Sequence, residues 1–296
     1  MLDTTKGRYW DRPWSLVSGC TPCSPGCERC WSAAMTKRFK PYVIEGDMAM
    51  PLITDDGQRF NGRIITHPER LSIPLKRRKP TVYAVWNDLF HEAVPRKFQR
   101  AAILVAASHK QHTFLILTKR PQVMLEVVGN MPAYATIYYG LTVCNQEEAD
   151  QKIPTFLKVP GKKFLSVEPM LGPIDLRKIN DTPLYCLDAI CGEQYIKHET
   201  NRSIADSFLG IDAVILGGET GAGARPMHPD WVRSVRDQCE ASGTPFFFKS
   251  WGKDIPDDGF FPKRALSNEE LQGFIFESMK SKRFLDGRTH DELAWT

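Results

Sequence analysis

The stretch TFLILTKRPQVMLEVVG (113–129) contains a strand, a polar turn and a helix in that order. Residues 113–118 are almost continuously apolar, which is typical of a strand buried on both faces of a parallel sheet. The basic pair Lys119 and Arg120 follows, and Pro121 suits the first turn of a helix. Gly129 is a typical helix C-cap. The stretch therefore predicts one βα unit.

The same kind of unit recurs along the chain. Helical patterns lie at 28–40, 95–109 and 228–243, between several further apolar runs. Strands that alternate with helices indicate βαβ units and a parallel sheet. The further apolar runs are residues 14–19, 81–86, 136–143, 163–168, 212–218 and 245–250.

Polar and charged groups follow strand after strand. The runs end in ND (87–88), TKRP (118–121), TVCN (142–145), SVEP (166–169), GGET (217–220) and KSWG (249–252). In a parallel barrel these carboxyl ends meet at one mouth, where active sites lie. We therefore expect an α/β fold with a partial (β/α) TIM-like barrel. An open doubly wound sheet is the alternative, because its ligand site also lies at the strand carboxyl ends.

The barrel is expected to span residues 1–252, with insertions at about 41–80 and 179–211. The first insertion contains a predicted hairpin at 53–62. Residues 253–296 are expected to form a C-terminal extension packed on the barrel, with a helical stretch at 267–282.

The composition of the 296 residues is that of a soluble globular chain with a net charge of +4. No apolar run reaches the roughly 18 residues of a membrane span, and the first residues contain no apolar signal core. We therefore expect no membrane partner and a cytoplasmic location. In that reducing compartment, clustered cysteines are more often metal ligands or redox groups than disulfides.

Four cysteines are clustered in GCTPCSPGCERCW (19–31). Cys23, Cys27 and Cys30 have the spacing C-x3-C-x2-C, whereas Cys20, Cys27 and Cys30 have C-x6-C-x2-C. All four could bind a structural zinc ion, although one short loop does not easily surround a tetrahedron. The alternative is a 4Fe-4S cluster held by three cysteines, with an open iron that binds S-adenosylmethionine. C-x3-C-x2-C before a helix, at the start of a partial barrel, resembles the signature of the radical S-adenosylmethionine superfamily.

A closer resemblance extends from about residue 10 to 292. It includes VWNDLFHEAVP (85–95), FLSVEPMLGPIDL (164–176), VILGGETGAGARPMHPDWVRSVRDQC (214–239) and LDGRTHDEL (285–293). These blocks resemble a phage-encoded family of unknown function within the radical S-adenosylmethionine enzymes, similar to spore photoproduct lyase. The family's usual motif resembles GCTPVSPGCxxCYA, so its three cysteines fall on Cys20, Cys27 and Cys30. We favour Cys20 over Cys23 as the first ligand for that reason.

The resemblance implies a set of cofactor contacts. The lyase-like enzymes hold the methionine end of S-adenosylmethionine with polar groups after successive strands, and Asp88 would accept from its ammonium while Lys119 and Thr142 bind its carboxylate. Asn87 and the aromatic Trp31 belong to the same set. Ser166, Glu168 and Glu219 are expected at the mouth as contacts to ribose or substrate, with Glu219 a candidate catalytic residue. The alternative for Asn87, Asp88, Lys119 and Thr142 is a polar group that solvates a strand end.

The resemblance also implies the reaction class, which is abstraction of a hydrogen atom from substrate. We expect the substrate to be a modified thymine or other pyrimidine in phage DNA, a nucleic acid or nucleotide that is rearranged or hypermodified. The basic runs at 75–80, 95–100 and 118–120 could neutralise phosphates or could form solvated basic faces. A reductant such as flavodoxin or ferredoxin is the expected protein partner, in the host cytoplasm.

Two alternatives remain open. One is a DNA-repair lyase, in which Cys144 would return a hydrogen atom to the product; Cys186 and Cys191 are weaker candidates. Cys144 could instead be a small buried residue without a chemical role. Cys239 is expected in the core. The other alternative is a non-catalytic zinc-binding protein.

Overall fold

The computed structural model describes residues 2–39, 42–45, 48–54, 57, 59–182, 185–196, 204–256 and 282–296. The helical stretch expected at 267–282 lies, except for residue 282, outside the described residues.

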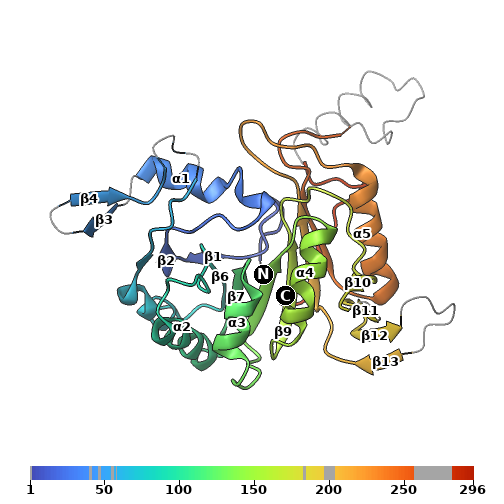
Figure 1. Cartoon of the computed structure of the whole chain (residues 1–296), viewed down its shortest axis with the longest axis horizontal. Helices are drawn as coiled ribbons and strands as arrows, with labels where there is room; N and C mark the ends of the chain where they lie inside the picture. The colour runs from blue at the N-terminus through green and yellow to red at the C-terminus, as the bar shows by residue number, and fades with distance from the viewer. Residues whose placement is uncertain are drawn as a thin grey trace.

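A curled sheet of seven parallel strands forms a half-barrel at the centre of the molecule (Figure 1). Its spatial order is also its chain order, so each crossover leads to the neighbouring strand. A doubly wound sheet would reverse its strand order at a switch point, so that alternative is wrong. The mixed α/β fold is as predicted. The strands are β1 (Arg12–Trp14), β6 (Thr81–Val85), β7 (His112–Thr118), β8 (Ile137–Thr142), β9 (Lys162–Val167), β14 (Ala213–Gly217) and β15 (Phe246–Ser250).

Helices cover the outer face of this sheet. They are α2 (Arg96–Ser108), α3 (Pro121–Val128), α4 (Gln146–Leu157) and α5 (Pro229–Ser242), while α1 (Trp31–Phe39) follows the cysteine loop near the mouth (Figure 1). Helix α3 begins at Pro121, as the opening stretch predicts. Gly243 caps the C-terminus of α5, and its φ of 69° is left-handed and favours glycine.

The apolar run at 14–19 does not form one strand. It supplies β1 to the main sheet and then β2 (Val17–Ser18), which pairs with β5 (Ile65–Thr66). Trp14, the last residue of β1, is fully buried and its indole donates to the Arg70 carbonyl at 2.8 Å.

Smaller elements lie in the two segments expected as insertions. Residues 179–207 contain a separate antiparallel sheet of β10 (Ile179–Asn180), β11 (Tyr185–Asp188), β12 (Glu193–Ile196) and β13 (Ile204–Ser207). The earlier segment contains β3 (Tyr42–Glu45) paired with β4 (Met48–Pro51), and the short 3-10 helices η2 (Pro68–Ser72) and η3 (Pro74–Lys76).

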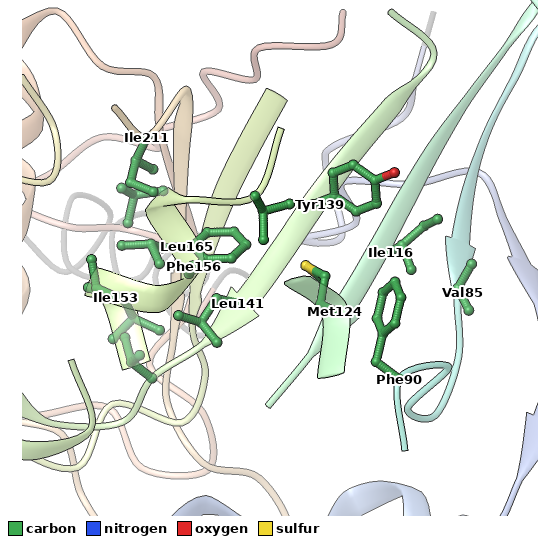
Figure 2. Packing of buried hydrophobic residues seen from close by; sticks show 14 of the residues in the cluster. Val85, Phe90, Ile116, Met124, Tyr139, Leu141, Ile153, Phe156, Leu165 and Ile211 are labelled. Atoms are coloured by element: carbon green, nitrogen blue, oxygen red, sulfur yellow. The ribbon is translucent and has the colours of Figure 1, made fainter. Parts of the chain in front are cut away.

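The core has two layers because alternate strand residues face opposite sides of the sheet. On the outer side, strand residues such as Ile116 and Leu141 pack against Met124 of α3 and Phe156 of α4 (Figure 2). The inner side is lined by a second cluster: Val82, Leu115, Tyr138, Phe164, Ala213, Ile215 and Phe247.

The end of the described chain covers that inner side. The Tyr138 hydroxyl donates to the Ala294 carbonyl at 2.6 Å, and the Trp295 indole donates to the Tyr9 carbonyl at 3.0 Å. The Trp295 ring also packs edge-on against Phe164, with centroids 5.5 Å apart. A half-barrel has no opposite wall, so this segment supplies apolar contacts that the missing strands of a full barrel would make. None of the described helices is long and apolar enough to cross a membrane.

Candidate functional site

A cavity of about 530 Å³ lies at the carboxyl ends of the strands. Most of the predicted site residues line it, although they come from segments far apart in the sequence. They are Cys20, Cys27, Cys30, Trp31, Asn87, Asp88, Lys119, Thr142, Ser166, Glu168 and Glu219. Cys23 and Cys144 do not line it.

The cysteine loop joins β2 to α1 and contains one 3-10 turn, η1 (Pro25–Cys27). Ser24 caps this turn, since its hydroxyl accepts from the Gly26 amide at 3.1 Å and its carbonyl accepts from the Cys27 amide at 2.9 Å. Gly26 packs directly on Cys144, because a Cβ on Gly26 would lie 2.6 Å from the Cys144 sulfur.

The thiols of the loop differ in acidity. A hydrogen bond from Cys23, with the positive charge of Lys119, holds the pKa of Cys27 well below its usual value. Burial raises the pKa of Cys20 to about 12 and also raises the pKa of Cys30. Cys23 is exposed, and its pKa is raised because it donates that hydrogen bond to Cys27. Cys27 is therefore the thiol that ionises first.

The donor set suits soft metals, because thiolates prefer zinc and iron–sulfur clusters. Within the described residues, no group of three or more His, Cys, Asp or Glu side chains is arranged to hold a metal ion. A zinc ion needs its ligands around one point. A cluster distributes its cysteines over several irons, so three thiols that face one cavity fit it chemically.

Arg120 anchors the start of the cysteine loop. Its guanidinium donates to the Thr21 carbonyl and to the Asp88 carboxylate, both at 2.8 Å. Asp88 also accepts from the Thr118 hydroxyl at 2.6 Å. The predicted ammonium acceptor is thus occupied in the structure by groups that fix Arg120 and, through it, the loop. Arg120 also pairs with Glu92 at 2.8 Å.

Arg225 anchors the other half of the loop. It donates to the Pro25 carbonyl at 3.0 Å and to Glu28 at 2.9 Å. Its Nε donates to Glu219 at 2.9 Å, and Arg29 lies 3.5 Å from the same carboxylate. Burial opposes the charge of Glu219, but the hydrogen bonds from Arg225 lower its pKa overall. This carboxylate stays ionised and holds Arg225, so it has no proton to offer as an acid.

Lys119 and Thr142 have free polar groups. In the part of the chain that the structure describes, neither side chain makes a hydrogen bond or ion pair. Burial opposes the charge of Lys119, but the neighbouring thiols of Cys144 and Cys27 raise its pKa overall. An ammonium and a hydroxyl that line the same cavity can receive an anion such as a carboxylate.

Glu168 is the centre of a second polar group. Its carboxylate accepts from Ser166 at 3.1 Å and from Tyr9 at 3.3 Å, and Lys249 pairs with it at 2.7 Å. Burial, followed by the charge of Glu168, raises the pKa of Tyr9, which keeps the phenol protonated. Sequence reasoning missed Tyr9 and Lys249, although the KSWG strand end contains Lys249.

Asn87 links three segments at the mouth. It accepts from the Ser32 hydroxyl at 2.7 Å and donates to the Val17 carbonyl at 2.8 Å. Its φ of 58° is left-handed, which asparagine tolerates better than most residues. These bonds fix the start of α1 against β2 and the end of β6.

Cys144 lies behind the cysteine loop. It is fully buried, and its sulfur lies 3.8 Å from the Ser24 hydroxyl. Cys239 is buried in α5, as predicted, while Cys186 and Cys191 lie in the region of the second sheet.

Three tryptophans form a row along the cavity. Trp31 packs edge-on against Trp86 with centroids 5.3 Å apart, and Trp86 packs edge-on against Trp10 at 5.8 Å. The Arg8 guanidinium lies over the Trp10 ring at 5.0 Å. Trp31 is 49% exposed, and Trp10 and Trp86 are half-buried.

Residues 4–294 match the protein family described as "Protein of unknown function (DUF5131)". No curated protein and no solved structure matches the chain.

Proposed function

The chain belongs to the DUF5131 family, whose function is unknown, and we propose from its cavity that it is a radical S-adenosylmethionine enzyme of the isomerase or lyase type. The observation that carries the proposal is that Cys20, Cys27 and Cys30 line one cavity with the ammonium of Lys119, which has no hydrogen-bond or ion-pair partner among the described residues. The cavity lies at the carboxyl ends of a curled parallel sheet, where barrel enzymes have their active sites.

Cys20, Cys27 and Cys30 would hold a 4Fe-4S cluster. When bound, such a cluster would supply the electron that cleaves S-adenosylmethionine, so that the released 5′-deoxyadenosyl group removes a hydrogen atom from the substrate. The chain contributes the ligands and their position. Cys27 is the most acidic thiol of the loop, which favours ligation as the thiolate. Arg120 and Arg225 fix the loop backbone on either side of Cys23.

The chain also contributes the groups that orient S-adenosylmethionine. Lys119 offers an ammonium to a carboxylate, and Thr142 offers a hydroxyl. Trp31 follows the last cysteine and has an exposed aromatic ring that can stack on an adenine. Asp88 and Asn87 act through the segments that they hold in place.

The proposed substrate is a modified thymine or other pyrimidine in phage DNA, which the enzyme rearranges or hypermodifies. The resemblance to spore photoproduct lyase motivates this choice, and the net charge of +4 is compatible with it. Glu168, Lys249 and Tyr9 line the cavity and offer both donors and acceptors to the edge of a base.

Cluster loading tests the ligand set. Wild-type protein and single Cys→Ala variants would be reconstituted anaerobically and their iron and sulfide measured. Cys20→Ala, Cys27→Ala and Cys30→Ala should lose the cluster, whereas Cys23→Ala, the matched control in the same loop, should keep it. If Cys20→Ala keeps the cluster and Cys23→Ala loses it, the first ligand is Cys23. Colourless wild-type protein loaded with zinc would refute the proposal.

Turnover tests the reaction. Reconstituted protein, S-adenosylmethionine and dithionite should yield 5′-deoxyadenosine, and modified phage DNA should increase the yield and give an altered nucleoside by mass spectrometry. Cys144→Ala should retain this turnover, because its sulfur is fully buried outside the cavity. Loss of turnover in a Cys144→Ala protein with a full cluster would instead favour the DNA-repair lyase.

A further inference from the structure

The row Trp10–Trp86–Trp31 has a cysteine at one end and a cation at the other. Trp31 is adjacent in sequence to Cys30, and Arg8 lies over Trp10. The angles between ring planes are 88° and 81°, so each contact is edge-to-face. In such a pair the ring that contributes its edge keeps its own faces free for another planar group. Trp31 is assigned to the cofactor above, which leaves Trp10 and Trp86 without a role.

The charges around the row select the kind of ligand. Arg8 lies over Trp10, is exposed and makes no ion pair within the described residues. An aromatic surface alone could attract an organic cation. Here the Arg8 guanidinium would repel a second cation, but it would attract a phosphate attached to a neutral ring. A planar base with its phosphate therefore fits the row better than a cationic ligand.

The size of the cavity selects the form of that ligand. The cavity of about 530 Å³ is of small-molecule size, and the cofactor of the proposed function would take part of it, so the remainder can receive a single base and not a segment of duplex. A base inside a duplex has both faces covered by neighbouring bases and therefore cannot stack on a tryptophan ring. A base on a single strand, or one extruded from a duplex, can do so.

We propose that the pair Trp10–Trp86 receives an unpaired nucleobase of a nucleic-acid strand, with one ring stacked on the base and the perpendicular ring against its edge, and with Arg8 contacting the adjoining phosphate. This inference rests on the nucleic-acid substrate of the proposed function and specifies its form: the strand enters single-stranded, or with its target base extruded.

Binding measurements test the inference without requiring turnover. Fluorescence anisotropy of a labelled oligothymidylate would be recorded with reconstituted protein at fixed salt, and compared with the same strand annealed to its complement. We expect the single strand to bind at least about tenfold more tightly, because stacking on an aromatic side chain contributes about 1–3 kcal/mol per base. Equal affinity for both forms would refute the inference.

Variants identify the contact. Trp10→Leu and Trp86→Leu should each weaken single-strand binding about tenfold, whereas Trp86→Phe should bind nearly as well as wild type because it keeps a ring. Arg8→Gln should weaken binding and reduce the salt slope by about one. Trp231→Leu is the control, since Trp231 is a half-buried tryptophan of α5 outside the cavity. Wild-type affinity in correctly folded Trp10→Leu and Trp86→Leu proteins would contradict the proposal.

Two further measurements separate the possible outcomes. Thymidine monophosphate is added as a competitor, and competition as strong as that of the strand would overturn the assignment to a strand in favour of a free nucleotide. Iron content and 5′-deoxyadenosine are measured on the same preparations. Loss of binding in the tryptophan variants of a protein that holds no cluster would support the stacking site and refute the radical chemistry, so the two failures are distinguishable.

Discussion

Gly26 fixes how closely the cysteine loop approaches the sheet. Its φ is not in the left-handed region, so the requirement for glycine arises from contact alone. A Cβ there would lie 2.6 Å from the Cys144 sulfur and 3.1 Å from Pro169 Cδ. The buried thiol predicted as a hydrogen donor is, in the structure, the surface on which η1 rests.

We expect Gly26→Ala to lower the free energy of unfolding by about 1–3 kcal/mol, because overpacking forces atoms apart. Cys144→Ala removes the nearer of the two atoms, so the cost of Gly26→Ala should fall by about 1 kcal/mol in that background. Urea unfolding of the four proteins of the cycle measures this coupling. Gly172→Ala is the control, because its Cβ would make an ordinary contact at 3.4 Å. Additive effects would mean that Gly26 and Cys144 do not press on each other.

At the scale of elements, strands were easier to predict than their connections. Apolar runs mark buried strands directly, and six of the seven lie within a residue or two of their predicted bounds. The run at 14–19 divides between two sheets, because β1 pairs with β6 and β2 pairs with β5, and no local pattern encodes these long-range pairings. Helix α4 has few apolar residues at its start and contains Pro154. The sequence feature that marks the start of α4 is its N-cap, because the Asn145 side chain accepts from the Glu148 amide at 2.9 Å.

The site could be predicted where the cysteine motif or the strand ends supply its residues. Lys119, Thr142 and Glu168 line the cavity because parallel strands bring their carboxyl ends together. The partners of those residues depend on tertiary contacts. Arg225 donates to a carbonyl 200 residues earlier in the chain, and Tyr9 bonds to a carboxylate 159 residues later. Neither contact has a periodic or local signature.

Asp286 ties the C-terminal segment to α5. Its carboxylate accepts from Arg233 at 2.9 Å and also pairs with Arg236. Burial opposes the charge of Asp286, but these hydrogen bonds lower its pKa overall. Because the pKa in the folded state lies below that of the unfolded chain, the contribution is present above the unfolded value of about 3.9 and is lost as pH falls through the folded value.

Asp286→Asn should therefore reduce the free energy of unfolding by about 1 kcal/mol at neutral pH. Asparagine tolerates the left-handed φ of 49° at this position, so the variant tests charge and not backbone strain. Urea unfolding of both proteins at neutral pH and at about pH 2 gives the comparison. The difference should shrink in acid, and an undiminished difference there would show that charge is not its cause.

At the scale of the molecule, the half-barrel depends on its C-terminal segment to cover its inner face. Trp295 packs against Tyr9, Tyr138 and Phe164, which come from the N-terminal segment and from two strands. One ring thus joins both ends of the described chain to the middle of the sheet.

Trp295→Ala should cost about 2 kcal/mol, somewhat less than a fully buried tryptophan, because this ring is partly exposed. Trp295→Phe should recover most of that loss, since it keeps the edge-on contacts. Thermal and urea unfolding provide the measurement. A Trp295→Ala protein within about 0.5 kcal/mol of wild type would mean that the segment lies on the sheet without stabilising it.

Arg120 and Arg225, which bind the backbone of the cysteine loop, connect two separated strands of the sheet through that loop. Arg120 follows β7 and Arg225 follows β14, and β8 and β9 lie between these strands. These two arginines are thus a path by which a change in the curvature of the sheet would reach the loop, and a ligand that fixes the thiols would oppose such a change. Occupancy of the loop and stability of the sheet are therefore linked, since a ligand that binds only the folded loop stabilises the whole fold by an amount that grows with the logarithm of its concentration relative to its Kd.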